Sequence, residues 1–236
     1  MSNIIILGFD TSTSVLSAAL YNKGHRSETL IACDDKQSTS QQSSLLIPTL
    51  NALLDQEGLR YDVVDHFAVT RGPGSFTGIR IGLATAQGLH LATKIPCFAP
   101  TSLQILAFQG QQQLRQQMPQ QTSATTSFLA LIDNKRGGYY GQVFNHDIQE
   151  QEPAKIWSLA EVQAYREQST NHYLVSHTEL DQGLMGLMPQ TSLANGLVDL
   201  LLYLLHKGGQ LPKQLQEQHL SPFYLVDPVY AKRQGV

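Results

Sequence analysis

The segment from Arg71 to Ile81, Arg-Gly-Pro-Gly-Ser-Phe-Thr-Gly-Ile-Arg-Ile, constrains the fold of this chain more than any other stretch. It follows residues 67–70, three apolar residues and a threonine, which are typical of a buried strand. The glycines on either side of Pro73 favour a tight turn. Ser75 is a preferred N-cap residue, so we expect a helix to begin there and to continue through Ala92. The segment therefore predicts a strand, a tight loop and a helix in direct succession.

The start of that helix allows two interpretations. A helix N-terminus presents backbone N–H groups at the positive end of the helix dipole, where an anion or a partner's carboxylate can bind. Alternatively, the loop only joins a strand to a helix and binds nothing. The residues alone leave both interpretations open.

The hydrophobic pattern predicts an α/β protein with two lobes, each with a mixed sheet flanked by helices. Strands are expected over residues 4–9, 15–21, 25–33, 67–70, 95–99, 128–132, 139–144 and 172–175. Helices are expected over 40–57, 75–92, 159–167 and 192–206. An N-terminal lobe is predicted over 1–108 and a smaller C-terminal lobe, with a helix and a tail, over 128–236. Residues 109–127, rich in Gln, Ser and Thr, predict a linker or loop between them.

Charge and composition exclude several classes of protein. The 236 residues carry a formal net charge of −3, so they lack the basic surface that binds a phosphate backbone unaided. Cys33 and Cys97 form no CxxC pair, and the longest apolar runs, such as residues 200–205, are far shorter than the ~20 residues that span a bilayer. Because no secretory leader precedes Ile4, we expect a cytoplasmic protein with no membrane contact.

The sequence contains no complete catalytic or metal-binding motif. Its eight histidines include neither HExxH nor a pair four residues apart on one helix. His172 and His177 are five apart on an extended segment, which turns their rings to opposite faces. There is no GxSxG, no GxxxxGK[ST] and no GxGxxG after the first strand, and Ser75 has no assignable His or Asp partner. We predict no catalytic residue and no metal ligand.

The triplet Asp10, Thr11 and Ser12 ends the first predicted strand. An acidic residue at such a strand end can orient a nucleotide or Mg²⁺. The alternative, which we favour, is that Asp10 and Thr11 only bond the backbone of the following turn.

Several segments together resemble the bacterial TsaB (YeaZ) family. They are Gly8-Phe-Asp-Thr-Ser12, the glycine-rich segment through Gly82 with Ala86-Gln-Gly-Leu89, Leu131-Ile-Asp133 and Pro228-Val-Tyr230. The glycine-rich segment is a specific signature, whereas the others are weak individually. The resemblance implies an actin/Hsp70/sugar-kinase-like fold of the ribonuclease H-like type.

The resemblance also implies a function without catalysis by this chain. Such a subunit binds and activates the TsaD subunit, together with the ATPase TsaE, in N6-threonylcarbamoylation of the adenosine beside the anticodon of ANN-decoding tRNAs. No cofactor is expected on this chain, because ATP, Mg²⁺ and the metal are expected on the partner subunits. The resemblance implies that tRNA is reached only through the complex, and that the isolated chain can pair with itself.

Two departures bear on this resemblance. TsaD-like subunits hold a metal through HxxxH on the helix before the glycine loop, and the corresponding residues 40–48 contain no histidine. Asp133-Asn-Lys-Arg-Gly-Gly138 replaces a more usual turn that contains Asp-Ala-Arg. The first departure argues against a metal centre in this chain, and the second argues against a nucleotide role of its second half.

Two predicted helices provide a candidate interface. Small residues on one stripe of a helix let a second helix approach closely. The interface is predicted to comprise Leu45, Thr49, Ala52, Gly78, Gly82, Thr85, Ala86 and Leu89. The alternative is that this stripe packs on the sheet of its own lobe. The residues of a vestigial nucleotide site, or simply of the turn, are predicted to be Asp10, Thr11, Ser12, Arg71, Gly72, Pro73, Gly74, Ser75 and Arg80.

Two rival functions follow from the same residues. The first is an active ATP-dependent small-molecule kinase or ATPase of the same fold, with Asp10 and Thr11 on the phosphates. The second, less favoured, is a metallopeptidase. The sequence leaves open whether Arg71 and Arg80 contact a nucleotide, tRNA or the partner subunit.

Overall fold

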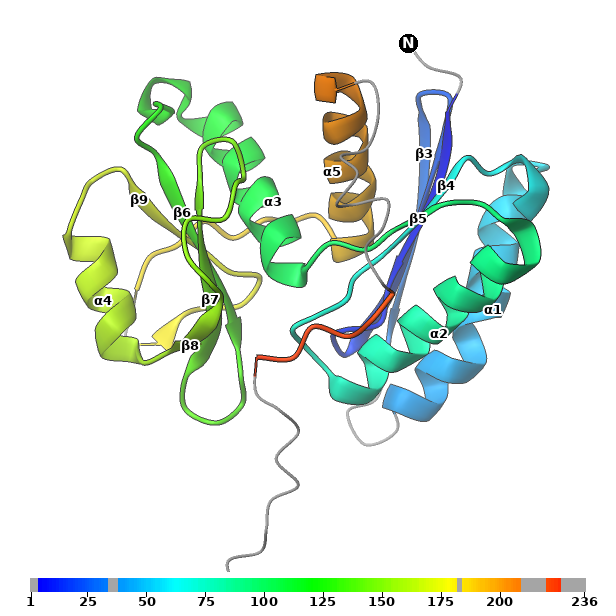
Figure 1. Ribbon diagram of the computed structural model, residues 1–236, viewed down its shortest axis with the longest axis horizontal. Helices are drawn as coiled ribbons and strands as arrows, with labels where there is room; N and C mark the ends of the chain where they lie inside the picture. Colours follow the sequence, from blue (N-terminus) through cyan, green and yellow to red (C-terminus); the bar gives the residue numbers. More distant parts are fainter. Residues whose placement is uncertain (1–3, 34–37, 182–183, 209–219, 226–236) are drawn as a thin grey trace, which may run out of the picture.

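The chain folds into two lobes, each built on one sheet, in the computed structural model shown in Figure 1, which describes residues 4–33, 38–181, 184–208 and 220–225. The sheet of the N-terminal lobe contains β1 (Ile5–Asp10), β2 (Val15–Asn22), β3 (His25–Ala32), β4 (His66–Val69) and β5 (Cys97–Phe98). The strands lie in the order β3-β2-β1-β4-β5. β2 is antiparallel to β1 and β3, whereas β4 is parallel to β1 and β5.

The C-terminal lobe repeats this topology with one strand fewer. Its strands are β6 (Ser127–Asp133), β7 (Tyr139–Asn145), β8 (Lys155–Trp157) and β9 (His172–Val175), in the order β8-β7-β6-β9. β6, β7 and β8 form an antiparallel meander and β9 is parallel to β6, as β1, β2, β3 and β4 are arranged in the first lobe. The sequence shows no internal repeat, so the likeness between the lobes lies in the backbone.

β1 is buried on both faces because helices cover both sides of its sheet. Ile5, Leu7 and Phe9 lie in the core that the sheet forms with α1 (Ser38–Gln56) and α2 (Phe76–Thr93). Ile6 points to the other face, toward α5 (Leu193–Gly208). Successive side chains of a strand point to opposite faces, so a strand covered on both sides needs a continuous apolar run.

The two inner helices are exchanged between the lobes. α3 (Ser102–Gln117) follows β5 along the chain, but it packs on β6, β7 and β9 of the second sheet. α5 follows β9, but it packs on β1, β2 and β4 of the first sheet. The two helices also contact each other and form the layer between the sheets (Figure 1). α4 (Leu159–Glu167) packs on β9, and two 3-10 helices, η1 (Tyr61–Val63) and η2 (Pro119–Gln121), lie in connections.

The Gln-rich stretch differs from the expected linker or loop. Its residues 109–117 are the second half of α3, and Gln109 and Gln111 are buried. The Gln109 Nε2 group donates to the backbone oxygens of Thr191 (3.0 Å) and Ser192 (2.8 Å). Glutamine is a good helix former, and its amide can be buried where backbone carbonyls accept its hydrogens. Composition therefore misidentified a helix that lies between the two sheets.

Most of the other predicted elements are confirmed. α4 and β9 have the predicted bounds, 159–167 and 172–175, and the remaining predicted strands and helices differ from the observed ones by a few residues at their ends. β8 was not predicted, because three residues are too few for a periodic pattern. Within the part of the chain that the structure describes, no helix combines the length and the apolar character that a membrane span requires.

Candidate functional site

The glycine-rich loop lies against the turn that follows β1. Gly72 has a φ of 98°, and a Cβ on Gly74 would overlap the backbone oxygen of Ser12. The N–H of Ser75 donates to that oxygen at 2.7 Å, and Ser75 Oγ accepts from the N–H of Gly78 at 3.2 Å. The predicted strand, loop and helix with Ser75 as N-cap are therefore confirmed. Two backbone N–H groups at the start of α2, those of Ser75 and Gly78, thus donate to acceptors of this chain.

Asp10 bonds the turn that follows β1, and Thr11 bonds the first turn of α2. Asp10 is buried, and its Oδ1 atom accepts from the N–H of Ser12 at 3.1 Å and from the Thr70 hydroxyl. Burial raises the pKa of the Asp10 carboxyl, which disfavours a charged group at this position. The Thr11 hydroxyl donates to the backbone oxygen of Gly78 at 2.7 Å. Asp10 therefore bonds the following turn, as the favoured alternative held, whereas Thr11 bonds the backbone of α2 instead.

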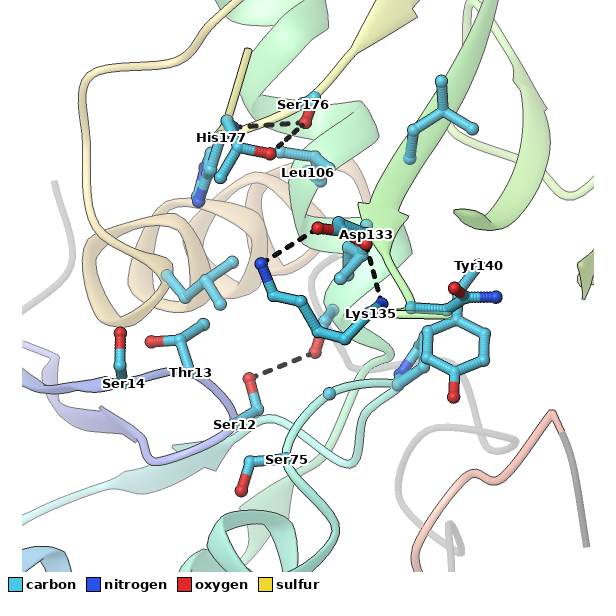
Figure 2. Close-up of a pocket in the computed structure, with 18 residues that line it drawn as sticks. Ser12, Thr13, Ser14, Ser75, Leu106, Asp133, Lys135, Tyr140, Ser176 and His177 are labelled. Carbon is cyan, nitrogen blue, oxygen red and sulfur yellow. Dashed lines mark hydrogen bonds and ion pairs between the residues drawn. The ribbon is translucent and has the colours of Figure 1, made fainter. Parts of the chain in front are cut away.

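A cavity of about 570 Å³ lies between the two lobes, beyond the carboxyl ends of β1, β6 and β9 (Figure 2). This is where α/β folds bind ligands, and the volume is within the range of small-molecule sites. Asp10 and Thr11 do not line it, whereas Pro73 and Gly74 do. Its wall carries hydroxyl groups from Ser12, Thr13, Ser14, Ser75, Ser102, Ser176 and Thr178. Its apolar wall comes from Leu106, Leu131, Ile132 and Leu193.

The charged groups that line the cavity offset one another. Lys135 Nζ lies 2.9 Å from Asp133 Oδ2, and the N–H of Lys135 donates to Asp133 Oδ1 at 2.7 Å (Figure 2). The Lys135 contacts hold the pKa of Asp133 below its ordinary value. Burial lowers the pKa of His177 to about 4, so its ring is neutral near pH 7. Its Nε2 atom lies 2.9 Å from Gln109 Oε1, which can only accept, so Nε2 carries the hydrogen.

The residues that line this cavity lack the groups that bind a triphosphate. Phosphate oxygens require several unpaired cationic donors or a Mg²⁺ ion held by carboxylates. The lysine of the cavity is paired with Asp133, and Asp10 lies outside the lining. Among the described residues, no three His, Cys, Asp or Glu side chains gather closely enough to hold a metal ion.

Part of the predicted interface was wrong. A Cβ on Gly78 would overlap the backbone oxygen of Thr11, and one on Gly82 would lie 2.7 Å from Thr11 Oγ1. Ala86 is fully buried, and so is most of Thr49. These small side chains let α2 lie close to β1 and β4, as the alternative interpretation held. Of the remaining predicted positions, Leu45, Thr85 and Leu89 are half-buried and Ala52 is exposed; their contact with a partner stays a prediction.

A different row of residues faces outward on α2. The row, called here the outer ridge, comprises Thr77, Ile81, Ala84, Gly88 and Leu91. Its members recur every three or four residues and therefore share one face of the helix. Leu91 is 67% exposed, and a Cβ on Gly88 would meet no atom within 4 Å. Ile81 is half-buried against the core of the lobe, and the other four members of the outer ridge are exposed. The outer ridge is thus a small surface that this chain leaves largely open.

Residues 220–225 lie along one flank of α2, which the sequence did not predict. Gln87 Nε2 donates to the backbone oxygen of Leu220 at 2.7 Å, and Arg80 Nε donates to the Tyr224 hydroxyl at 2.9 Å. The N–H of Phe223 donates to the backbone oxygen of Arg71 at 2.7 Å, and the Arg71 guanidinium lies 5.1 Å from the centre of the Phe223 ring. Both arginines whose roles were open therefore hold this segment.

The only local signal for this segment is the aromatic pair at 223 and 224, which follows the mostly polar residues 213–219. In Figure 1 the segment is the red trace that passes between the lobes. Pro228-Val-Tyr230, which contributed to the family resemblance, lies outside the described residues.

The fold and the cavity define the class of this protein. A meander of three strands followed by a parallel fourth, repeated in two lobes around a central cavity, is the ribonuclease H-like α/β arrangement of the actin, Hsp70 and sugar-kinase class. The predicted fold class is confirmed.

Comparisons with known proteins find relatives of this chain. The model of the family described as TsaD, tRNA N6-adenosine threonylcarbamoyltransferase, matches residues 36–144. The Escherichia coli (strain K12) tRNA threonylcarbamoyladenosine biosynthesis protein TsaB is 30% identical over 142 residues, which are 60% of this chain and 55% of that protein. Its Bacillus subtilis (strain 168) namesake is 34% identical over 105 residues, 44% of each chain.

A solved structure has the same fold. YeaZ from Pseudomonas aeruginosa superimposes with a TM-score of 0.66 at 22% identity, over 94% of this chain and 100% of that one. The match with the Escherichia coli relative spans about half of that protein's length. The chain is similar to proteins of the TsaB/YeaZ family.

Proposed function

We propose that this chain is an accessory subunit in the biosynthesis of tRNA threonylcarbamoyladenosine, and that it binds a TsaD subunit and makes it competent to transfer the threonylcarbamoyl group. The observation that carries the proposal is the outer ridge of α2, a largely exposed row of mostly small and apolar side chains on a long helix. The names of the curated relatives and the TsaD family match support the same pathway.

The outer ridge suits the close approach of a partner helix. Helix axes pack 8–10 Å apart, and the shorter distances require small residues at the contact. Ala84 and Gly88 provide such positions, and Leu91 beside them offers a side chain that a partner can bury. On α1, Pro48 and Ala52 are exposed, so the neighbouring helix adds a second small surface. We propose that a helix pair of TsaD packs on α1 and α2, and that the isolated chain dimerises through the same surface.

The charges of the cavity support an accessory role over the kinase alternative. A phosphoryl-transfer site needs cationic groups and carboxylates around the phosphates. Here the cavity's lysine is paired, and Asp10 is buried beside Thr70. The net charge of −3 likewise favours contact with tRNA through the complex, in which TsaE is the further partner.

Calorimetric titration with a TsaD subunit tests this function. The wild-type chain should bind, and Gly88→Trp should bind at least tenfold more weakly, because an indole on the outer ridge blocks helix approach. The position is open, so Gly88→Trp should still fold, as thermal unfolding can show. Ala164→Trp, on the exposed side of α4, is the matched control and should bind as the wild type does. A wild-type chain that fails to bind TsaD, or that turns over Mg-ATP alone, would refute the proposal.

A further inference from the structure

Arg80 is held in one orientation by two aromatic residues. Its guanidinium carbon lies 3.7 Å from the centre of the Phe76 ring, and its Nε group donates to the Tyr224 hydroxyl at 2.9 Å. The Phe76 and Tyr224 rings are themselves stacked, with 5.1 Å between their centres. Phe76, Arg80 and Tyr224 are called here the arginine clamp. A planar guanidinium stacked on a ring loses much of its rotational freedom before any partner arrives.

The charge of the clamp is left without an opposite charge in the described part of the chain. Among the arginines there, Arg26 and Arg60 form ion pairs, with Asp199 and Asp62, whereas no ion pair of the described residues involves Arg80. A guanidinium has five N–H donors, and the Tyr224 hydroxyl uses one of them. Arg80 is exposed, so its other donors are accessible to a partner. Two donors in a fixed plane match the two oxygens of a carboxylate.

The clamp borders the outer ridge. Arg80 directly precedes Ile81 in α2 and lies one turn before Ala84, both of which belong to the ridge. Residues 220–225 form the side of the clamp that α2 does not supply, with Leu220 in contact with the core of the N-terminal lobe. A partner helix on the outer ridge would therefore pass beside an oriented, unpaired cation.

We propose that the arginine clamp is a second part of the docking surface, and that Arg80 pairs with a carboxylate of the partner subunit. The inference rests on the proposed function, since it concerns the same partner. Continuity with the apolar outer ridge favours a protein carboxylate over a phosphate of tRNA, because an apolar row is the surface that another protein buries. The clamp would fix the register of the partner helix, which small side chains alone leave loosely defined.

Titrations at low and high salt separate this inference from the proposed function. Wild-type binding to TsaD establishes the partnership, and Arg80→Met should then weaken it about tenfold at low salt. The difference between wild type and variant should shrink at high salt, because screening weakens the ion pair. Arg115→Met, which removes an exposed charge from the last turn of α3, is the matched control and should change the affinity less than twofold.

Variants of Tyr224 test the orienting role. Tyr224→Ala should weaken binding several-fold but should add little to Arg80→Met, because both changes remove one interaction. Tyr224→Phe keeps the ring and removes the hydroxyl, so it remains informative if the alanine variant does not fold. An unchanged affinity of Arg80→Met for TsaD overturns the inference. It is equally overturned if Arg80→Met impairs only tRNA binding by the assembled complex, or only self-association of the chain.

Discussion

Replacing Gly78 by alanine should destabilise the protein, whereas the same change at Gly88 should stabilise it. Both glycines lie within α2, where alanine is favoured over glycine by about 0.5–1 kcal/mol. At Gly88 the new Cβ would meet no atom within 4 Å, so the gain is retained. At Gly78 the Cβ would overlap the backbone oxygen of Thr11 and lie 3.0 Å from its carbonyl carbon.

The overlap at Gly78 cannot be relieved by rotating a side chain, because the oxygen belongs to the backbone after β1. Overpacking of this kind costs about 1–3 kcal/mol. A shift of α2 also lengthens the 2.7 Å hydrogen bond from the Thr11 hydroxyl to the Gly78 oxygen, and such a bond contributes about 1 kcal/mol. After the helix gain is subtracted, Gly78→Ala should lower the free energy of unfolding by about 2 kcal/mol. That corresponds to a fall in Tm of about 4–8 °C for a chain of this size.

Urea unfolding followed by circular dichroism measures both variants against the wild type. The midpoint should fall for Gly78→Ala and rise slightly for Gly88→Ala, with an unchanged dependence on urea concentration. If the two variants are equally stable, or if Gly88→Ala is the weaker one, the assignment of the inner and outer faces of α2 is wrong.

Two further predictions concern the layer between the lobes. Burial lowers the pKa of His177 to about 4 from 6.5. Between these two pH values the unfolded chain therefore binds more protons than the folded chain. The contribution of His177 to the free energy of unfolding should be complete above pH 6.5 and should be lost progressively toward pH 4. Urea midpoints at several pH values measure this loss, and a His177→Gln chain that declines as steeply would contradict it. Gln109→Ala should lower the free energy of unfolding by about 1–3 kcal/mol, because two backbone oxygens near α5 lose their donor. Gln116→Ala, at an exposed position on the same helix, should change it by less than about 0.5 kcal/mol in the same urea assay.

The parts of the fold that the sequence predicted correctly depend on local chemistry. Ser75 caps α2 by accepting from the N–H of Gly78, and Ser158 and Glu161 cap α4 reciprocally. The buried runs of β1 and β6 differ plainly from the polar turns that follow them. Such signals lie within a few residues of one another, so one sequence is enough to find them.

The parts that were missed depend on contacts between distant residues. α2 carries small side chains on two faces, and only the position of Thr11 determines that Gly78 and Gly82 face inward. The burial of Gln109 depends on carbonyls more than 80 residues away, at Thr191 and Ser192. The clamp residue Tyr224 reaches α2 across a sequence separation of 144 residues. Helical periodicity identifies such faces but does not say what covers them.

The exchange of α3 and α5 makes each half of the chain depend on the other. A fragment that ends before α5 would leave Ile6, Ala19 and Ala68 of the first sheet in contact with water, and a fragment that begins after α3 would do the same to Phe128 and Val175. Neither half has a complete core of its own, so dissecting the protein at the predicted linker should yield two aggregating fragments. In the intact chain the two lobes should unfold in a single transition. A substitution in α5 should destabilise the sheet that contains β1, although β1 lies nearly 200 residues earlier in the sequence.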